Sequence, residues 1–393
     1  MSQRSVIVGA RRSPMGKFLG SLSALTAPQI GAVVAKDVLD SVGCPPEDVD
    51  LALIGEVLQA GVGQNPARQV ALGAGLPETI TAVTVNQVCG SGLRAAMNGD
   101  NNIRLGEAKI MLAGGIESMS NVPHYLRGMR TGAVKFGDGT LIDGMVHDGL
   151  SCPFEHWGMG EAAEYTAKKY NVAREDQDAF AVQSHHRAAE ARRTGAYKPF
   201  ISPIPIKSRK QTVVFSEDES IRGDATIEAL AKLSPAFDKN GTVTAGNSSQ
   251  LTDGAAMVLL ASQDEAAKRG WPVRATIMGH TTFGVAPKEL FMAPVGAVRQ
   301  LLDKLDLKIG DIDLFEINEA FAAQMVACMR GLEISADRVN VLGGAIALGH
   351  PIGASGTRVL VTLINAMEQR DAKRGVATLC LGGGNAVAML IER

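Results

Sequence analysis

Short apolar runs alternate with helix-like stretches along most of this chain. The runs that resemble strands cover residues 5–9, 80–88, 110–113, 314–317 and 376–379, and those that resemble helices cover 320–329 and 356–367. Alternation of this kind predicts a sheet with helices on its faces, and therefore an α/β fold.

The middle of the chain has a different pattern. Residues 122–250 contain a charged helical run at 161–193, a proline-interrupted stretch at 198–207 and an acidic stretch at 216–220. We expect a loop-rich insertion that lies over the first half. His185 and His186 fall inside the charged run, where a solvated helix face is favoured over a catalytic role.

A faint repeat relates the two ends of the chain. Residues 50–56 match 313–319 at an offset of 263, residues 91–94 match 355–358 at 264, and residues 110–115 match 378–383 at 268. Three matches in one order predict a duplicated domain, since the period is far too long for a solenoid. The expected organisation is an N-terminal half (1–121), the inserted loop domain (122–250), a return to the core with a linker (251–270) and a C-terminal half (271–393).

Composition narrows the class of protein. The chain has 393 residues and a formal net charge of -2, which excludes the basic face of a nucleic-acid binder. Its five cysteines form no CxxC pair, which argues against a disulfide framework and against a zinc or other metal site. No run approaches the roughly 18 apolar residues of a membrane helix. The first predicted strand begins at residue 5, so a signal or transit peptide is not expected. A cytoplasmic protein is therefore expected.

Cys89 is the first candidate for chemistry. It closes the apolar run 80–88 and opens a glycine-rich turn into a predicted helix. Backbone N–H groups at the start of a helix favour a thiolate, so the position is typical of a nucleophile. A small cysteine packed beside glycines explains the same residues, and both interpretations stay open at this point.

Three further polar positions follow apolar strands. Asn318 precedes a helix, where capping is favoured over the orientation of a water or an oxyanion. His350 is surrounded by five glycines in residues 343–356 and is a candidate base for a thiol, with a buried, satisfied histidine as the alternative. Cys380 precedes three glycines whose N–H groups could bind an anion, and its thiol could transfer protons.

Together these segments resemble the thiolase family of CoA-dependent enzymes, which join or cleave 3-ketoacyl thioesters. The matching motifs are residues 86–92, 113–120, 244–249, 253–256, 318–321, 349–356 and 380–384. The resemblance covers residues 6–393 and implies a doubled five-layer α/β/α/β/α core with an inserted loop domain. It also implies an enzyme of fatty acid metabolism and β-oxidation that forms a homotetramer or a homodimer. Its substrates would be coenzyme A and acyl-CoA, and it would contain no permanently bound cofactor and no metal.

The resemblance also implies roles for individual residues. Cys89 matches the nucleophile that carries the acyl group, His350 the base, and Cys380 the acid/base at the second acyl-CoA. Asn318 matches the residue that holds a water at the enolate oxygen, and the N–H groups of Cys89 and Gly382 match the oxyanion hole. The positions that match CoA contacts are Leu150, Met159, Arg222, Ala245, Gly246, Ser249 and Phe321. Of these, Arg222 is expected to reach the nucleotide.

Several residues depart from the family pattern. Gly158 stands where many acetoacetyl-CoA thiolases have histidine, with His156 two residues earlier, and Leu290 stands where many have methionine. Asn385 is also less usual after the triple glycine. The first two departures fall near the expected acyl pocket, so the sequence leaves the acyl length open between acetyl and longer groups.

Two other functions compete with that of a thiolase that condenses acetyl-CoA to acetoacetyl-CoA. A condensing enzyme acting on carrier-protein thioesters pairs its cysteine with two histidines, or with histidine and asparagine, so Cys380 favours a thiolase. A non-catalytic acyl-CoA or lipid-binding relative would have lost Cys89 or His350, and both are present.

Overall fold

A computed structural model describes residues 4–207 and 211–393. Within these residues, ten strands form one continuous sheet in the order β12-β13-β14-β11-β1-β10-β5-β3-β4, with β2 (Gly16–Lys17) paired to β10. One half of the sheet contains β1 (Ser5–Arg12), β3 (Leu51–Gly55), β4 (Thr81–Val85), β5 (Ile110–Ser118) and β10 (Thr252–Ser262). The other half contains β11 (Ala275–Gly284), β12 (Leu314–Ile317), β13 (Arg374–Leu381) and β14 (Asn385–Glu392). The halves meet where Val6 of β1 pairs with Thr276 of β11.

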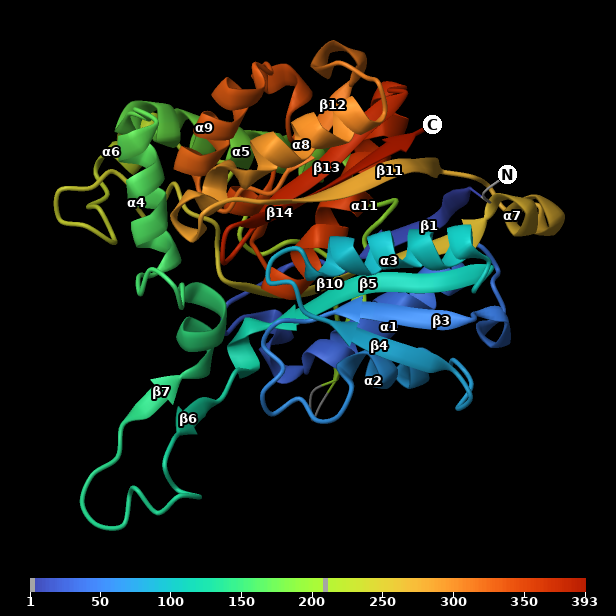
Figure 1. The fold of residues 1–393 in the computed structure, drawn as a ribbon, viewed down its shortest axis with the longest axis horizontal. Coiled ribbons are helices and arrows are strands. Elements are labelled where there is room, and N and C mark those ends of the chain that lie inside the picture. Colours follow the sequence, from blue (N-terminus) through green and yellow to red (C-terminus); the bar gives the residue numbers. More distant parts are fainter. Residues whose placement is uncertain (1–3, 208–210) are drawn as a thin grey trace.

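Helices on both sides of each half-sheet complete five layers (Figure 1). Helices α3 (Ser91–Leu105) and α11 (Ile352–Arg370) pack against each other between the half-sheets. On the outer face of the first half lie α1 (Ala27–Asp40) and α2 (Pro66–Gly73), and α8 (Ala293–Lys304) covers the second half with α9 (Ala322–Leu332) beside it. A short helix, α7 (Gln263–Arg269), links β10 to β11. This is the predicted α/β/α/β/α arrangement.

The two halves repeat one order of elements, and one pair of hydrogen bonds from backbone N–H groups to an aspartate is duplicated with it. Asp50 Oδ2 accepts hydrogen bonds from the N–H groups of Lys109 and Ile110, and Asp313 Oδ2 accepts from those of Lys373 and Arg374. Asp50 directly precedes β3 and Asp313 directly precedes β12, and each fixes the start of the neighbouring strand, β5 or β13. The unit β3–α3–β5 therefore corresponds to β12–α11–β13.

Strand register corrects the third sequence match. Leu51 pairs with Met111 in the first half, and Leu314 pairs with Gly375 in the second, so Met111 corresponds to Gly375. The sequence comparison aligned residues 110–115 four positions too late. The compared residues 110–115 and 378–383 are almost all apolar or glycine, and such runs contain few polar residues that could fix their alignment.

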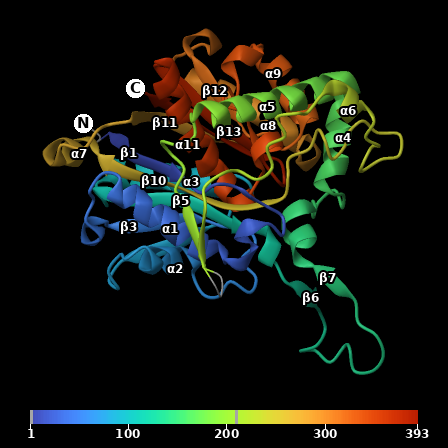
Figure 2. The same cartoon turned by 180° about the vertical axis from the view of Figure 1, so that it is seen from behind.

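The inserted segment contacts both halves. Its charged run forms two helices, α4 (Met159–Lys169) and α5 (Arg174–Thr194), which pack against α9 and, for α5, α10 (Ala345–Leu348) of the second half (Figure 2). The hairpin of β8 (Ile204–Lys207) and β9 (Thr212–Phe215) packs on the first half, while β6 (His124–Leu126) and β7 (Leu141–Asp143) form a projecting arm. A short α6 (Ile227–Ala231) contacts α5. The inserted segment was expected to lie over the first half, and this was wrong for α4 and α5. The charge pattern of a helix does not show which part of the fold the helix packs against.

His185 contradicts the solvated-face interpretation. Its side chain is buried, its Nδ1 accepts a 3.1 Å hydrogen bond from the Arg222 N–H, and burial together with the Arg222 charge lowers its pKa to about 4. His186 is exposed, as the solvated-face interpretation predicts, with Nε2 2.8 Å from the Ala225 carbonyl oxygen. Helix α5 has two kinds of polar side chain. Its last turn, with Arg192 and Arg193, is exposed. Four others, Gln177, Asp178, Ser184 and His185, are buried because each has a hydrogen-bond partner.

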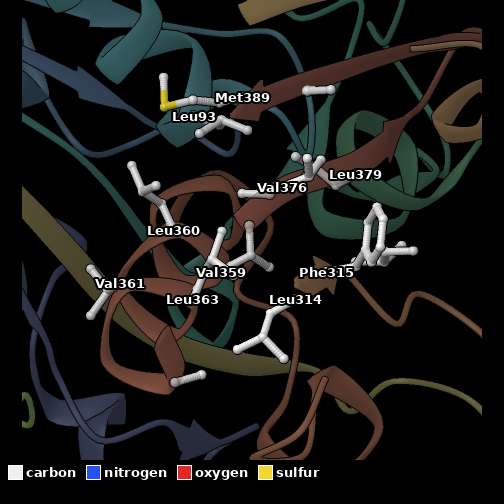
Figure 3. Close-up of a cluster of buried hydrophobic side chains, with 14 of the residues drawn as sticks. Leu93, Leu314, Phe315, Val359, Leu360, Val361, Leu363, Val376, Leu379 and Met389 are labelled. Carbon is white, nitrogen blue, oxygen red and sulfur yellow. The ribbon is translucent and has the colours of Figure 1, made fainter. Parts of the chain in front are cut away.

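The core around α11 gives the site a rigid support. Every residue of this helix from Ile352 to Met367 is buried. Figure 3 shows its Val359, Leu360 and Leu363 among apolar side chains from the neighbouring strands and from α3. Close-packed interiors have low compressibility and few voids. The packing around α11 therefore holds the loop that precedes this helix in place. Among the described helices, none has both the length and the apolar character needed to cross a membrane.

Candidate active site

Cys89 lies in a tight turn between β4 and α3. The preceding residue, Val88, has a φ of +48°, a conformation that costs free energy for a β-branched side chain. Short polar side chains hold the turn: Asn86 Oδ1 accepts from the Val88 N–H at 3.0 Å, and Ser91 Oγ donates to the Val88 carbonyl at 2.6 Å and accepts from the Gln87 N–H. The turn fixes the Cys89 thiol at the end of the strand.

His350 faces that thiol. Its Nε2 lies 3.3 Å from Cys89 Sγ, and its Nδ1 lies 2.5 Å from Ser355 Oγ. Because Ser355 donates its only hydroxyl proton to the Pro351 carbonyl oxygen at 2.8 Å, it must accept from Nδ1–H. This assignment from the hydrogen-bond network leaves the lone pair of Nε2 directed at the thiol, as a base requires.

Burial favours the neutral form of both partners. Burial raises the pKa of the Cys89 thiol to about 12, although the N–H groups of Gly382 and Cys89 lower it in part. Burial and the Arg358 charge lower the pKa of His350 to about 3. The expectation of a thiolate stabilised by the helix end was therefore wrong, because desolvation of the charged sulfur outweighs the backbone N–H groups.

Asn318 does not cap the following helix. Helix α9 begins at Ala322 with Phe321 at its N-cap, so the capping interpretation was wrong. The Asn318 side chain is buried instead, where Oδ1 accepts a 2.8 Å hydrogen bond from Arg358 Nη2 and Nδ2 lies 3.4 Å from His350 Nδ1. The amide is thus part of the site around His350.

Cys380 and Gly382 complete the site from the end of β13. Cys380 is buried, and burial, followed by electrostatic interaction with Cys89, raises its pKa well above the usual range. The two cysteines therefore share one site. The Gly382 N–H is directed at Cys89 Sγ. Gly384 has a φ of +90°, and a Cβ there would lie 2.5 Å from the Val285 carbonyl oxygen, so the loop requires glycine.

Apolar side chains surround Cys380 closely. The buried members of this cluster are Ala162, Ala163, Val243, Leu290, Phe291, Ala320 and Phe321, with Trp157 and Met159 packed against them. Any substrate atom that meets the Cys380 thiol therefore meets apolar surroundings.

Comparison with known protein families identifies the family of this chain. Residues 5–264 match the family described as "Thiolase, N-terminal domain", and residues 271–393 match "Thiolase, C-terminal domain".

The chain belongs to the thiolase family. It is similar to acetyl-CoA acetyltransferases of Pseudomonas aeruginosa and Chromobacterium violaceum, each 50% identical, with 100% and 98% of this chain and 100% and 99% of those proteins covered. A crystal structure of the Bacillus anthracis acetyl-CoA acetyltransferase matches with a TM-score of 0.97 at 41% identity, over 100% of this chain and 99% of that one. The chain is thus a thiolase, an acyltransferase that uses CoA thioesters.

The residues that match the family's CoA contacts fall at different distances from the two thiols. Met159 and Phe321 belong to the cluster around Cys380, and Leu150 belongs to a second cluster that contacts Cys89. The turn with Ala245, Gly246 and Ser249 is joined to the site by a 3.0 Å hydrogen bond from the Ser249 N–H to the Ala320 carbonyl.

Arg222 lies apart from this set. It is exposed, and among the described residues no hydrogen bond to its guanidinium links it to the other six positions. Its assignment to the nucleotide end of CoA stays a prediction.

No group of His, Cys, Asp or Glu side chains within residues 4–207 and 211–393 could hold a metal ion.

Sequence reasoning assigned no role to two residues that organise the thiolase site. Ser355 fixes the His350 ring, and Glu117 accepts hydrogen bonds from the N–H groups of Val57, Leu58 and Gly353. Burial raises the pKa of Glu117 to about 7, against these three donors. Both residues lie inside recognised motifs, so the motifs marked them without revealing which atoms they contact.

Proposed function

We propose that this thiolase is an acetyl-CoA C-acetyltransferase, which condenses two acetyl-CoA molecules to acetoacetyl-CoA and CoA and catalyses the reverse thiolysis. The observation that carries the proposal is the 3.3 Å contact between Cys89 Sγ and His350 Nε2, with the Gly382 N–H directed at the same sulfur. The acetyl group is supported by the names of the similar proteins and by the close apolar surroundings of Cys380.

Thiolysis begins with transfer of the Cys89 proton to His350 Nε2 as the sulfur attacks the 3-keto carbon. The N–H groups of Cys89 and Gly382 stabilise the oxyanion that forms, and one such donor typically contributes about 3 kcal/mol. The neutral starting pair suits this step, because proton transfer and attack occur together and no buried charge is present beforehand.

The bond between C2 and C3 then breaks, which leaves an acyl group on Cys89 and the enolate of acetyl-CoA. We assign the stabilisation of the enolate oxygen to His350 and to a water held by Asn318. Cys380 gives its thiol proton to the enolate carbon. A raised pKa suits both directions, since the thiol is protonated for thiolysis and its thiolate is a strong base for condensation.

Entry of CoA completes the cycle. Its thiol gives a proton to the Cys380 thiolate and attacks the acyl group, and Cys89 leaves and regains its proton from His350. Each proton and each bond is thereby restored, and condensation follows the same steps in reverse. Covalent capture divides the reaction into two half-reactions and predicts ping-pong kinetics.

We further propose that the chain acts as a homotetramer or homodimer in the cytoplasm. Support for an oligomer comes from the edge strand β4, where Val83 is exposed, and from the arm of β6 and β7, where Leu126, Met129 and Phe136 are exposed. Exposed edges and apolar arms favour association with a second copy. All five cysteines are unpaired, as is typical of a reducing compartment.

A direct assay tests the proposed activity. The purified full chain is mixed with CoA and acetoacetyl-CoA or longer 3-ketoacyl-CoA, and loss of the enolate absorbance is followed. Turnover should be fastest with acetoacetyl-CoA. No turnover at any length, together with no acyl-enzyme by mass spectrometry, would overturn the proposal.

A further inference from the structure

The segment Pro287–Met292 forms one wall of the cluster around Cys380. Two of its residues, Leu290 and Phe291, are 1% and 2% exposed and pack in that cluster. On one side, the Phe291 carbonyl oxygen accepts from Cys328 Sγ of α9. At the start of the segment, Gly384 lies against Pro287. The wall is therefore supported from α9 and from the glycine loop.

Glu289 ties this wall to α4 on the other side. Its Oε1 accepts hydrogen bonds from the Tyr165 hydroxyl at 2.6 Å and from the Lys169 ammonium group, and its Oε2 accepts from the Tyr170 hydroxyl at 2.8 Å. These donors lower the pKa of Glu289 against burial, so the carboxylate is charged and each hydrogen bond is charge-assisted.

The same anchor reaches the opposite wall of the cluster. The Tyr165 ring packs against Trp157 with 5.6 Å between ring centroids, and Met159 begins α4. Trp157 and Met159 both pack on the cluster around Cys380. One carboxylate thus connects the wall that carries Leu290 to the helix that carries the facing residues.

We propose that Glu289 is a positioning residue for substrate specificity: it clamps residues 287–292 to α4, holds Leu290 and Phe291 beside Cys380, and thereby excludes substrates substituted at the α-carbon. This inference rests on the proposed function. Cys380 exchanges its proton with the α-carbon, so a substituent on that carbon meets the residues around Cys380. An apolar pocket gains from burying an extra methyl group and rejects it only if its walls cannot yield.

The test compares thiolysis of acetoacetyl-CoA with that of 2-methylacetoacetyl-CoA. For Glu289→Ala we expect the ratio of kcat/KM for the methylated to the plain substrate to rise at least tenfold, while acylation of Cys89 by acetyl-CoA stays within twofold. The double variant Tyr165→Phe/Tyr170→Phe removes two donors and should raise the ratio in the same direction. It also provides a second test if Glu289→Ala does not fold.

Two controls separate a clamp from general loosening. Asp176→Ala breaks the 2.7 Å ion pair with Arg330, which joins α5 to α9 away from Cys380, and should leave the ratio unchanged. 3-Ketohexanoyl-CoA places its extra carbons on the acyl group that Cys89 receives, so its ratio to acetoacetyl-CoA should stay constant in the Glu289 variant.

Each contrary result has a distinct meaning. An unchanged methyl ratio, an equal rise for both bulky substrates, or a wild-type enzyme that already accepts the α-methyl substrate as well as acetoacetyl-CoA would overturn the clamp and leave the proposed function intact. A wild-type enzyme with no acetoacetyl-CoA activity would instead overturn the proposed function.

Discussion

Arg358 determines which way the Asn318 amide points. Its Nη2 donates a 2.8 Å hydrogen bond to Asn318 Oδ1, so Nδ2 is left facing His350. Its Nη1 lies 3.2 Å from Glu316 Oε1, and both charged side chains are buried. The Asn318 amide can accept the hydrogen bond from Arg358 only with its oxygen. Its NH2 group therefore faces His350 and can donate a hydrogen bond in the reaction.

Removal of this pair should damage the chemistry more than the fold. In Arg358→Met/Glu316→Gln no buried charge is left unpaired, whereas Arg358→Met alone should cost about 3–5 kcal/mol of stability. We expect the double variant to lose about 10- to 100-fold in condensation, because the Asn318 amide is free to turn. Loss of the nearby positive charge should also raise the pKa of His350, which moves the acid limb of the acylation profile to higher pH.

Stopped-flow acylation and steady-state condensation, each measured against pH, check this prediction. Glu316→Gln alone serves as the control, since it keeps the hydrogen bond from Arg358 to Asn318. A double variant with an unshifted pH profile and an equal loss in both steps would contradict the role given to Arg358.

Replacing Cys89 and Cys380 one at a time should show that the two cysteines act in different steps. Cys89→Ser should show no acyl-enzyme mass shift with acetyl-CoA, because the serine hydroxyl is a far weaker nucleophile. Cys380→Ser should still be acylated on Cys89 while condensation falls by at least about 10³-fold. Intact-protein mass spectrometry and a condensation assay distinguish the steps, with the buried Cys328→Ser as a control outside the proposed chemistry. Equal loss of both steps in Cys380→Ser would refute the division.

The sequence indicated three of the polar positions as strand ends. Cys89 and Asn318 each follow a strand, Cys380 lies at the end of one, and the ends of neighbouring strands meet at one edge of a sheet. His350 instead follows the short helix α10, and its place facing Cys89 comes from the tertiary structure. The apolar runs predicted parts of β1, β4, β5, β12 and β13, whereas β3, β10, β11 and β14 were not among the expected strands.

Burial could not be predicted in this way. The neutral Cys89–His350 pair, the covered His185 and the hydrogen bond from His350 to Ser355 all depend on what packs over a residue from distant segments. Helix-end N–H groups are local and visible in a sequence, while desolvation is a tertiary effect and here is the larger one. The four-residue error at Met111 has a similar origin, since register depends on pairing with a distant strand.

Cys89 should contribute no thiolate near neutral pH. A thiol with a raised pKa stays protonated below that value, and an imidazole with a lowered pKa stays neutral above it, so both groups are neutral between about pH 3 and pH 12. The ultraviolet thiolate absorbance of the wild type minus that of Cys89→Ser should be zero from pH 5 to pH 9. Cys328→Ser gives the baseline for a buried thiol. An absorbance that appears with a midpoint below pH 9 would show that an ion pair exists.

Glu56 should make the fold less stable as pH rises. Its carboxyl group is buried and, among the described residues, both oxygens have no hydrogen-bond partner, and burial followed by repulsion from Glu117 raises its pKa to about 9. Below the ordinary carboxyl pKa the folded and unfolded chains are both protonated there. Above it the unfolded chain ionises first, so the wild type loses up to about 1.4 kcal/mol per pH unit until the folded pKa is reached.

Glu56→Gln removes that linkage, since an amide does not titrate. The variant should match the wild type near pH 4.5 and become progressively more stable than it up to about pH 9. Chemical denaturation at pH 4.5, 6.5 and 8.5 measures the difference, and Glu78→Gln on the exposed surface provides the matched control. A difference that is constant with pH would mean that Glu56 is already ionised in the folded protein, because only a proton retained on folding produces a slope.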